Sequence, residues 1–292
     1  MQKIKKKILI TGANGFVGKN LTNLLKKKYT VYAVDYLSNQ KHTSKEIINL
    51  NLVNKKLIFK FFKNKTIDYI FHLASISDID YSVKYPKKTL QNNINSLLNI
   101  LELAVEKKIK RIIFSSTIYA YSKQGSFYRI SKLTCEELLQ EYNRLYNLQF
   151  VVIRYGSIYG FDKNNNNSIL KMINQAVTYK NIIRLGNGNE KRNFIHIDDV
   201  IKITEKMMFI NIKKHRYFDI LGCQVYSIKD VIKLIKNILP DVKVNYNHKV
   251  DPHHYSTSPK NKDKYEIKKI YSKKRSLQYD IKKLIDHSKI YT

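Results

Sequence analysis

A tyrosine and a lysine four residues apart, Tyr128 and Lys132, could do acid–base chemistry together. This spacing places both side chains on one face of a predicted helix that begins near them. A free tyrosine has a pKa of about 10, so its use as a base near neutral pH requires about 4 kcal/mol of phenolate stabilisation. A neighbouring ammonium group lowers a tyrosine pKa. Lys132 is therefore the candidate stabiliser of a Tyr128 base.

A threonine at the end of a strand-like run supports this interpretation. Residues 114–117 read Phe-Ser-Ser-Thr and close a strand predicted over 111–115, shortly before the tyrosine. The end of a parallel strand places small hydroxyl groups where such sheets bind their ligands. Thr117 can then hydrogen-bond the reacting alcohol. In a chain with 22 tyrosines a Tyr-x-x-x-Lys pair is common by chance, and Thr117 distinguishes this one.

A glycine-spaced turn near the N-terminus predicts a dinucleotide site. Residues 8–18 read ILITGANGFVG, in which an apolar strand-like run enters the turn and a helical pattern leaves it. Gly12 permits the tight turn, Gly15 lets the backbone approach a pyrophosphate, and Gly18 lets the helix pack against the strand. The phosphates would meet the positive end of that helix. The alternative is an ordinary strand, turn and helix with incidental glycines.

An acid at the end of the second predicted strand indicates which dinucleotide binds. The strand over 29–34 is followed by Asp35, whose carboxylate can accept hydrogen bonds from the adenosine ribose hydroxyls and repels a 2′-phosphate. Residues 36–39 contain no arginine to hold that phosphate, although Lys41 is close. NAD is therefore favoured over NADP.

The elements that must position these residues alternate along the chain. Strands are predicted over 7–11, 30–34, 67–73, 111–115 and 150–154, and helices over 15–28, 90–107 and 131–146. Such alternation predicts an α/β fold of the Rossmann type with a doubly wound parallel sheet. Ligands lie beyond the carboxyl ends of such strands, which singles out Ser75, Thr117 and Tyr155.

The chain is expected to divide near residue 158. Residues 1–158 would form the NAD-binding domain, and 159–292 a smaller, mainly substrate-binding C-terminal lobe, with a segment near 192–220 returning to the first domain. Within the lobe we expect helices near 169–179 and over 226–239, and an edge strand over 242–246. A length of 292 residues with 43% hydrophobic content suits two unequal lobes.

The strongly basic composition does not by itself indicate nucleic-acid binding. The formal net charge is +31, but only eight of the 54 basic residues are arginine, and lysines lie on the outer positions of almost every element. No aromatic-interleaved basic motif accompanies them, so we expect solvated faces and no nucleic-acid partner. The chain has no run of eighteen apolar residues and no signal-peptide pattern, which predicts a cytoplasmic protein without stable membrane insertion.

The cysteines and a pair of histidines carry weak signals. Cys135 and Cys223 lack metal-ligand spacing, and we assign them no chemistry. His253 and His254 are adjacent, but no third ligand is evident in the sequence. A surface loop or a substrate-facing loop is therefore favoured there over a metal site.

The glycine turn, Thr117, Tyr128 and Lys132 together make the sequence resemble the short-chain dehydrogenase/reductase superfamily, in particular its extended branch of NAD-dependent sugar-nucleotide epimerases and dehydratases. The resemblance implies NAD as the cofactor and a nucleotide-sugar substrate. It also implies a homodimer through the helices around 90–107 and 129–146, whose apolar residues could equally be core. It covers most of the chain and includes, in the family's order, residues 72–75 (HLAS), 93–99 (NINSLLN), 154–160 (RYGSIYG) and 192–200 (RNFIHIDDV).

The resemblance also implies the site residues. The catalytic set is Thr117, Tyr128 and Lys132, with Lys132 also holding the nicotinamide ribose. An oxidised nicotinamide would be a second cation that lowers the Tyr128 pKa together with Lys132. Arg192 would contact the substrate diphosphate, for which the arginine fork is suited, and a surface salt bridge is the alternative. Ser157 and Thr117 are the other expected substrate contacts. The expected cofactor-binding residues are Gly12, Asn14, Gly15, Phe16, Val17, Gly18, Asp35, Leu73, Ala74, Ser75, Asn93, Ser115, Tyr128, Lys132 and Tyr155.

Several positions depart from the family pattern. Asn51 stands where the acid of the third-strand motif is usual, Asn193 where an acid follows the diphosphate arginine, and Ser157 where the Arg-x-x-Asn segment has its asparagine. The interval from Thr117 to Tyr128 is shorter than in most relatives, which trims a loop over the sugar pocket. The usual C-terminal Arg-Pro-Gly-Asp is missing.

One further departure bears on the reaction. The 4,6-dehydratases of this branch have Asp-Glu directly after the catalytic threonine, whereas this chain has Ile118 and Tyr119, so water elimination lacks its general acid and base. Decarboxylases use a glutamate in the same neighbourhood. We therefore expect a 4-epimerase with a transient 4-keto intermediate, in the supply of a surface polysaccharide, or else a C4 dehydrogenase or reductase without epimerisation. A non-catalytic NAD-binding sensor or scaffold is the alternative of another class.

Overall fold

A computed structural model describes residues 5–37, 46–162, 167–213, 215–247 and 265–290. Two features of the sequence lie outside these ranges, namely Lys41 and the pair His253 and His254. Among the described residues, no helix is long and apolar enough to span a membrane. In the same ranges, no group of three His, Cys, Asp or Glu side chains could hold a metal ion.

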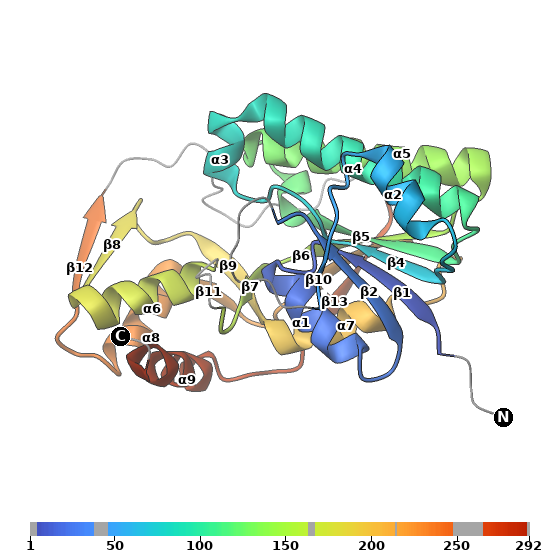
Figure 1. Cartoon of the computed structure of the whole chain (residues 1–292). Helices are drawn as coiled ribbons and strands as arrows, with labels where there is room; N and C mark the ends of the chain where they lie inside the picture. The colour runs from blue at the N-terminus through green and yellow to red at the C-terminus, as the bar shows by residue number, and fades with distance from the viewer. Residues whose placement is uncertain (1–4, 38–45, 163–166, 214, 248–264, 291–292) are drawn as a thin grey trace.

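The larger part of the chain is built on one eight-stranded sheet (Figure 1). Its strands lie in the order β13-β10-β6-β5-β4-β1-β2-β3, and every neighbouring pair is parallel. They are β1 (Lys7–Thr11), β2 (Thr30–Asp35), β3 (Ile48–Asn49), β4 (Tyr69–His72), β5 (Arg111–Thr117), β6 (Phe150–Tyr155), β10 (Tyr217–Leu221) and β13 (Ile267–Tyr271). The strand order reverses between β1 and β4, and sheets of this kind bind their ligands beyond the carboxyl ends of the strands at such a point. The predicted α/β, doubly wound parallel fold is confirmed.

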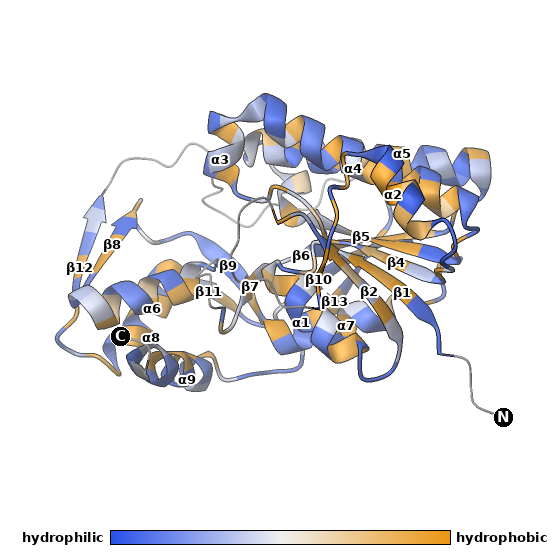
Figure 2. Cartoon of the chain, viewed as in Figure 1, coloured by the Kyte–Doolittle hydropathy of each residue, from blue (hydrophilic) through white to orange (hydrophobic). Residues whose placement is uncertain are grey.

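Helices cover both faces of this sheet, each with its apolar side inward (Figures 1 and 2). One face carries α2 (Lys55–Phe62), α4 (Pro86–Glu106) and α5 (Ser126–Tyr146), and the other carries α1 (Phe16–Leu25) and α7 (Ile197–Lys206). Two connections that the sequence patterns did not predict approach the carboxyl ends of the strands, the short helix α3 (Ile79–Lys84) and the 3-10 turn η1 (Ile118–Tyr121).

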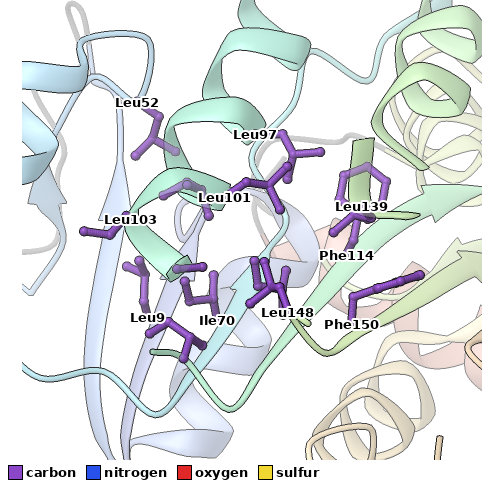
Figure 3. Close-up of a cluster of buried hydrophobic side chains, with 14 of the residues drawn as sticks. Leu9, Leu52, Ile70, Leu97, Leu101, Leu103, Phe114, Leu139, Leu148 and Phe150 are labelled. Atoms are coloured by element: carbon purple, nitrogen blue, oxygen red, sulfur yellow. The ribbon is translucent and has the colours of Figure 1, made fainter. Parts of the chain in front are cut away.

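Alternate residues of the central strand supply the two hydrophobic layers. Leu9 packs with Ile70 and with Leu97 of α4 in the layer that Figure 3 shows. Ile8 and Ile10 belong to the opposite layer, beneath α1 and α7. All five side chains are fully buried, and burial of each stabilises the fold by roughly 1.5–3 kcal/mol. A strand buried on both faces reads as a continuous apolar run, which is why β1 could be predicted from sequence.

The remaining elements form a smaller lobe on the left of Figure 1. It has a hydrophobic cluster of its own, in which Ile173, Val231 and Ile281 are fully buried. Its helices and strands are α6 (Ser168–Tyr179), α8 (Ile228–Lys236), α9 (Leu277–Ile290), β8 (Asn181–Leu185) and β12 (Lys243–Asn247). Between this lobe and the large sheet lies a small sheet made of β11 (Val225–Ser227), β9 (Lys191–His196) and β7 (Ser157–Tyr159).

The helix near 169–179 and the edge strand over 242–246 are confirmed by α6 and β12. The helix expected over 226–239, with Ser227 as its cap and Pro240 as its stop, is α8. Ser227 does cap it, in a capping box with Asp230, but the helix ends earlier than expected, at Lys236. The chain returns to the large sheet twice, through β10 after α7 and through β13 between β12 and α9, and β13 had no clear signal in the sequence.

Candidate active site

The glycine turn between β1 and α1 has the geometry of a phosphate cradle. Gly12 has a φ of +69°, and a Cβ there would lie 2.6 Å from the backbone nitrogen of Ala74. A Cβ at Gly18 would lie 2.0 Å from the carbonyl oxygen of Gly12. Helix α1 begins at Phe16 with no side-chain cap and no acid in its first turn, so its first N–H groups are left for an anion. The residues present fit a dinucleotide pyrophosphate.

The carboxylate of Asp35 lies beside that turn. It accepts hydrogen bonds from the backbone N–H groups of Asn14 and Tyr36, both at 2.8 Å. Burial raises the pKa of Asp35, and these two hydrogen bonds oppose the rise. The contact with Asn14 fixes the end of β2 against the glycine turn, which places the acid where an adenosine ribose would lie.

Helix α5 and strand β5 bring the predicted catalytic residues together. The Nζ atom of Lys132 donates a hydrogen bond to the carbonyl oxygen of Ser115 at 2.7 Å and lies 5.8 Å from the centre of the Tyr128 ring. Thr117, two residues after Ser115, hydrogen-bonds the Tyr128 side chain. Thr117 and Lys132 are buried, at 6% and 2% exposure. Tyr128 beside them is only partly buried. The three side chains therefore share one site, which is desolvated around Thr117 and Lys132.

Burial dominates the electrostatics of this site in the protein alone. It raises the pKa of Tyr128 to about 12, and the hydrogen bond with Thr117 opposes that rise. Burial also lowers the pKa of Lys132 to about 8, against the attraction of Cys135 and Glu136. The expected lowering of the tyrosine pKa combined two cations, the lysine and an oxidised nicotinamide. The lysine by itself does not outweigh the desolvation of the phenolate.

Asn93 of α4 connects the loop after β4 to α4 and to α5. The Asn93 side chain accepts from the N–H of Ile76 at 2.7 Å, and it donates to the carbonyl oxygen of Ile76 and to Ser131 Oγ, both at 3.0 Å. Ser131 in turn donates to the carbonyl oxygen of Tyr128 at 2.7 Å. The sequence patterns named Asn93 but missed Ser131 and Ser82, whose Oγ accepts from the N–H of Tyr128 at 3.3 Å.

The segment over 72–75 is hydrogen-bonded to the neighbouring strand β1. Thr11 Oγ1 lies 2.9 Å from His72 Nδ1 and accepts from the N–H of Ala74 at 3.3 Å. Burial lowers the pKa of His72 to about 3, so this imidazole is neutral at physiological pH. Leu73 and Ala74 therefore follow an uncharged histidine that is hydrogen-bonded to β1, and Ser75 after them is partly exposed.

Tyr155 lies on the opposite side of the sheet from Tyr128. Its side chain belongs to the hydrophobic layer beneath α1 and α7, and its hydroxyl is 2.9 Å from Thr204 Oγ1 in α7. The structure therefore does not bring this hydroxyl to the catalytic residues. Phe16 and Val17, in the first turn of α1, pack against the same layer.

Two of the three residues predicted to contact substrate, Arg192 and Ser157, lie on the small sheet, and the third, Thr117, lies on β5. Arg192 on β9 is only 8% exposed, which argues against an exposed salt bridge, and its Nη1 donates to the carbonyl oxygen of Lys191 at 3.0 Å. Ser157 on β7 pairs with Phe194, two residues along from Arg192. Asn193 donates to the carbonyl oxygen of Gly222 at 3.2 Å, a contact that the usual acid at this position could not make.

Two of the other departures from the family pattern, at Asn51 and at Ile118, have local structural roles. Asn51 accepts from the N–H of Val53 at 2.9 Å and so forms the turn before α2. In η1, the first residue after Thr117 is Ile118, which is buried against Leu221. No Asp or Glu lies in η1, which is fully described by the structure.

A family model, that of the NAD dependent epimerase/dehydratase family, matches residues 8–217. The chain belongs to this family. NAD is accordingly its cofactor, and Asp35 with the glycine turn at Gly12, Gly15 and Gly18 would hold it. The members of the epimerase/dehydratase family share the fold described above with this chain, and they include epimerases and dehydratases.

The similar proteins within the epimerase/dehydratase family include a dehydratase and epimerases. A dTDP-D-glucose 4,6-dehydratase of Dictyostelium discoideum is 30% identical over 67% of this chain, which spans only 54% of that protein. A putative UDP-glucose 4-epimerase of Methanocaldococcus jannaschii is 27% identical, over 79% of this chain and 81% of its own length. The crystal structure of a UDP-glucuronic acid 4-epimerase from Bacillus cereus, with UDP-glucuronic acid and NAD, covers 98% of this chain and 100% of its own, with a TM-score of 0.82 at 24% identity.

Proposed function

We propose that this chain is an NAD-dependent 4-epimerase of nucleotide-activated sugars that acts through a transient 4-keto sugar. The observation that carries the proposal is the cluster of Thr117, Tyr128 and Lys132 at the same end of the parallel sheet as the glycine turn, with Ile118 and Tyr119 after Thr117 in place of an acidic pair. Such a site can remove a proton from an alcohol. It has no acid in η1 to assist the loss of water.

The roles of the side chains follow from their contacts. Tyr128 Oη would accept the proton of the sugar C4 hydroxyl, and Thr117 would orient both oxygens through its hydrogen bond with Tyr128. Lys132, fixed by Ser115, would hold the ribose and stabilise the phenolate. NAD, when bound, supplies the two-electron oxidation of C4 and its reversal, and the 4-keto sugar must turn over between the two steps so that C4 is reduced on its opposite face. Return of the proton from Tyr128 to the rebuilt hydroxyl then completes the cycle.

The high pKa of Tyr128 makes this base conditional on the cofactor. In the protein alone burial holds that pKa at about 12, so the phenol keeps its proton at physiological pH. A second positive charge close to the ring, present when oxidised cofactor is bound, favours the phenolate. Tyr128 therefore gains its basicity in the loaded enzyme, which limits unwanted proton transfer in the empty one.

The proposed binding residues form two groups. For the cofactor we propose the turn residues Asn14 to Val17 with their flanking glycines, Asp35, the loop from Leu73 to Ser75, and Asn93. For the substrate we propose Arg192 on the diphosphate, with Ser157 and Thr117 nearer the sugar. The fork of an arginine suits a diphosphate, and the burial of Arg192 strengthens the charge-assisted hydrogen bonds it would make.

We also propose a homodimer through α4 and α5. These helices pack on each other over the sheet, and their inner residues, such as Leu97 and Leu139, are fully used by the core. Apolar side chains remain on the outer surface of α5, where Ile130 is 45% exposed and Leu145 is 54% exposed. Light scattering at several concentrations tests this proposal, and a monomer at all of them would contradict it.

The reaction is tested with a panel of UDP-, GDP-, CDP- and dTDP-sugars. Mass spectrometry and NMR should find a product of unchanged mass with an inverted C4 centre. Loss of water from a substrate would contradict the exclusion of dehydratase chemistry. Consumption of NAD in stoichiometric amounts would favour a C4 dehydrogenase, because an epimerase regenerates its cofactor in each cycle. A sensor or scaffold would transform no sugar, although it would bind NAD.

A further inference from the structure

A fully buried ion pair lies directly behind the catalytic residues. Glu136 and Arg154 are each 1% exposed. Glu136 is one helical turn after Lys132 on α5, and its carboxylate accepts from Arg154 Nε at 3.0 Å, from Arg154 Nη2 and from Ser116 Oγ. Ser116 and Arg154 stand opposite each other in the pairing of β5 with β6. One carboxylate therefore ties α5 to two strands, next to the catalytic threonine.

The same arginine also reaches the segment after Thr117. Arg154 stands opposite Asp219 in the pairing of β6 with β10, and Asp219 Oδ1 accepts from the Tyr121 hydroxyl at 2.7 Å. The guanidinium carbon of Arg154 lies 4.7 Å from the centre of the Tyr121 ring. Tyr121 ends η1, the turn that follows Thr117. Both flanks of Thr117 are therefore fixed to Arg154, through Ser116 with Glu136 on one side and through Tyr121 on the other.

A buried ion pair is an inefficient way to stabilise a fold, because the cost of removing both charges from water offsets much of their attraction. It is an effective way to fix geometry, because its paired hydrogen bonds are directional. Here it joins the strand that carries Thr117 to the helix that carries Tyr128 and Lys132. A small misplacement of reacting groups can lower a rate on the order of 100-fold, so this junction matters for catalysis.

We propose that Glu136 and Arg154 are positioning residues of the active site, which set the register of α5 against β5 and so hold Tyr128 and Lys132 in place relative to Thr117. The proposal deepens the proposed function and rests on it for the turnover readout. Neither residue touches the sugar or the cofactor in this scheme. They act through Ser116, Tyr121 and the helix.

The charge of Glu136 also acts on Lys132. The titratable groups around Lys132 are Tyr128, Cys135 and Glu136 on its own helix and His72 on β4. Among them, Glu136 and Cys135 raise the pKa of Lys132 and so preserve its ammonium form against burial. Loss of the Glu136 charge should therefore move the deprotonation of Lys132 to lower pH.

The test compares Glu136→Gln with a matched carboxylate-to-amide change, Asp68→Asn. Asp68 accepts a hydrogen bond from the N–H of Lys7 at the amino edge of the same sheet. Glu136→Gln should lower kcat on the order of 100-fold with KM and NAD affinity within about 2-fold, and should shift the alkaline limb of the pH profile to lower pH. Asp68→Asn should leave kcat and the profile unchanged. Wild-type kcat and an unshifted profile in folded Glu136→Gln would overturn the proposal.

Two further measurements keep the test decisive. If Glu136→Gln does not fold, Tyr121→Phe and Ser116→Ala, which remove one hydroxyl each, should still lower kcat by about 10-fold, and unchanged kcat in both would overturn the proposal. An ultraviolet titration of tyrosinate in the NAD-bound protein, taken as the difference from Tyr128→Phe, needs no turnover. Ser116→Ala and Tyr121→Phe, which remove no charge, should raise the Tyr128 pKa in that titration, because a displaced Lys132 stabilises the phenolate less. If no sugar nucleotide is turned over by the wild type, the proposed function fails, while this titration still decides the positioning role.

Discussion

The amino ends of the strands in the large sheet (its amino edge) and their carboxyl ends (its carboxyl edge) each carry an ion pair, but one pair is exposed to water and the other is buried. At the amino edge, Lys110 pairs with Asp68 at 2.9 Å with side chains 60% and 28% exposed. At the carboxyl edge, Arg154 pairs with Glu136 with both side chains 1% exposed. The first pair is screened by water and contributes little. The second is desolvated, so it constrains geometry and shifts the charges around it. The proposed active site lies at the edge where the ion pair is buried.

Among the substitutions that test this comparison, Gly18→Ala at the glycine turn should have the largest effect on NAD binding. In Gly18→Ala the new Cβ would lie 2.0 Å from the carbonyl oxygen of Gly12, so the turn must move. We expect no NAD binding detectable by calorimetry, and an unfolding free energy lower by about 1–3 kcal/mol. Gly186→Ala is the control: its φ is +82°, but nothing lies within 4 Å of the new Cβ. NAD affinity should be unchanged there, and equal losses in both variants would contradict the account of the turn.

Lys132→Met should have the next largest effect. We expect turnover to fall by roughly 100- to 1,000-fold, because both the ribose contact and the phenolate stabilisation are lost. The variant also tests the buried charge through stability. Burial holds the folded-state pKa of Lys132 at about 8, below its ordinary value of 10.5.

The sign of that stability effect is fixed by proton binding. Between pH 8 and pH 10.5 the unfolded chain binds more protons at Lys132 than the folded chain does. The wild-type unfolding free energy should therefore gain on the order of 3 kcal/mol from this group as pH rises through that window, and lose it as pH falls through 8. Denaturant titrations of wild type and Lys132→Met at several pH values measure the difference. Parallel pH profiles for the two proteins would show that Lys132 titrates normally.

Asn93→Ala should cost about 2–3 kcal/mol of unfolding free energy, because a buried side chain with four hydrogen bonds is lost and the N–H of Ile76 is left without its acceptor. Asn245→Ala is the matched change in the lobe, where the side chain makes one exposed hydrogen bond to Asn181 at 3.2 Å. It should cost less than about 0.5 kcal/mol. Comparable losses in the two variants would remove the distinction between buried and exposed polar groups.

Lys110→Met, at the amino edge, should have the smallest effect. The exposed pair with Asp68 predicts a change of less than about 1 kcal/mol that shrinks further at high salt. Turnover should equal that of the wild type. A loss of activity in this variant would show that the amino edge also takes part in function.

Features set by neighbours in the sequence could be predicted from it. The turn at Gly12 and the spacing of Tyr128 and Lys132 are local, and the apolar run of β1 is buried on both faces. The polar junction behind the site was missed, because Glu136, Arg154 and Asp219 come from three distant segments. A signal was available: Glu136 follows Lys132 by one turn on the inner face of an amphipathic helix, where a charge needs a buried partner.

The electrostatic expectation for Tyr128 shows a second limit of sequence reasoning. The spacing of Tyr128 and Lys132 indicated an attraction that lowers the tyrosine pKa, but the depth of burial could not be read from it. In the structure desolvation is the largest influence on both groups. Similarly, the sequence placed Tyr155 at the carboxyl end of its strand, but not on the α7 side of the sheet, where its hydroxyl meets Thr204.

The turnover of Tyr128→Phe, measured with NAD affinity on the same preparation, tests the central claim most directly. Phenylalanine keeps the ring and removes the oxygen that would carry the proton. On a sugar nucleotide that the wild type epimerises, kcat should fall by at least about 1,000-fold, with NAD affinity within about 2-fold and an unchanged melting temperature. Retention of kcat within about 10-fold would contradict the claim that this phenol is the base.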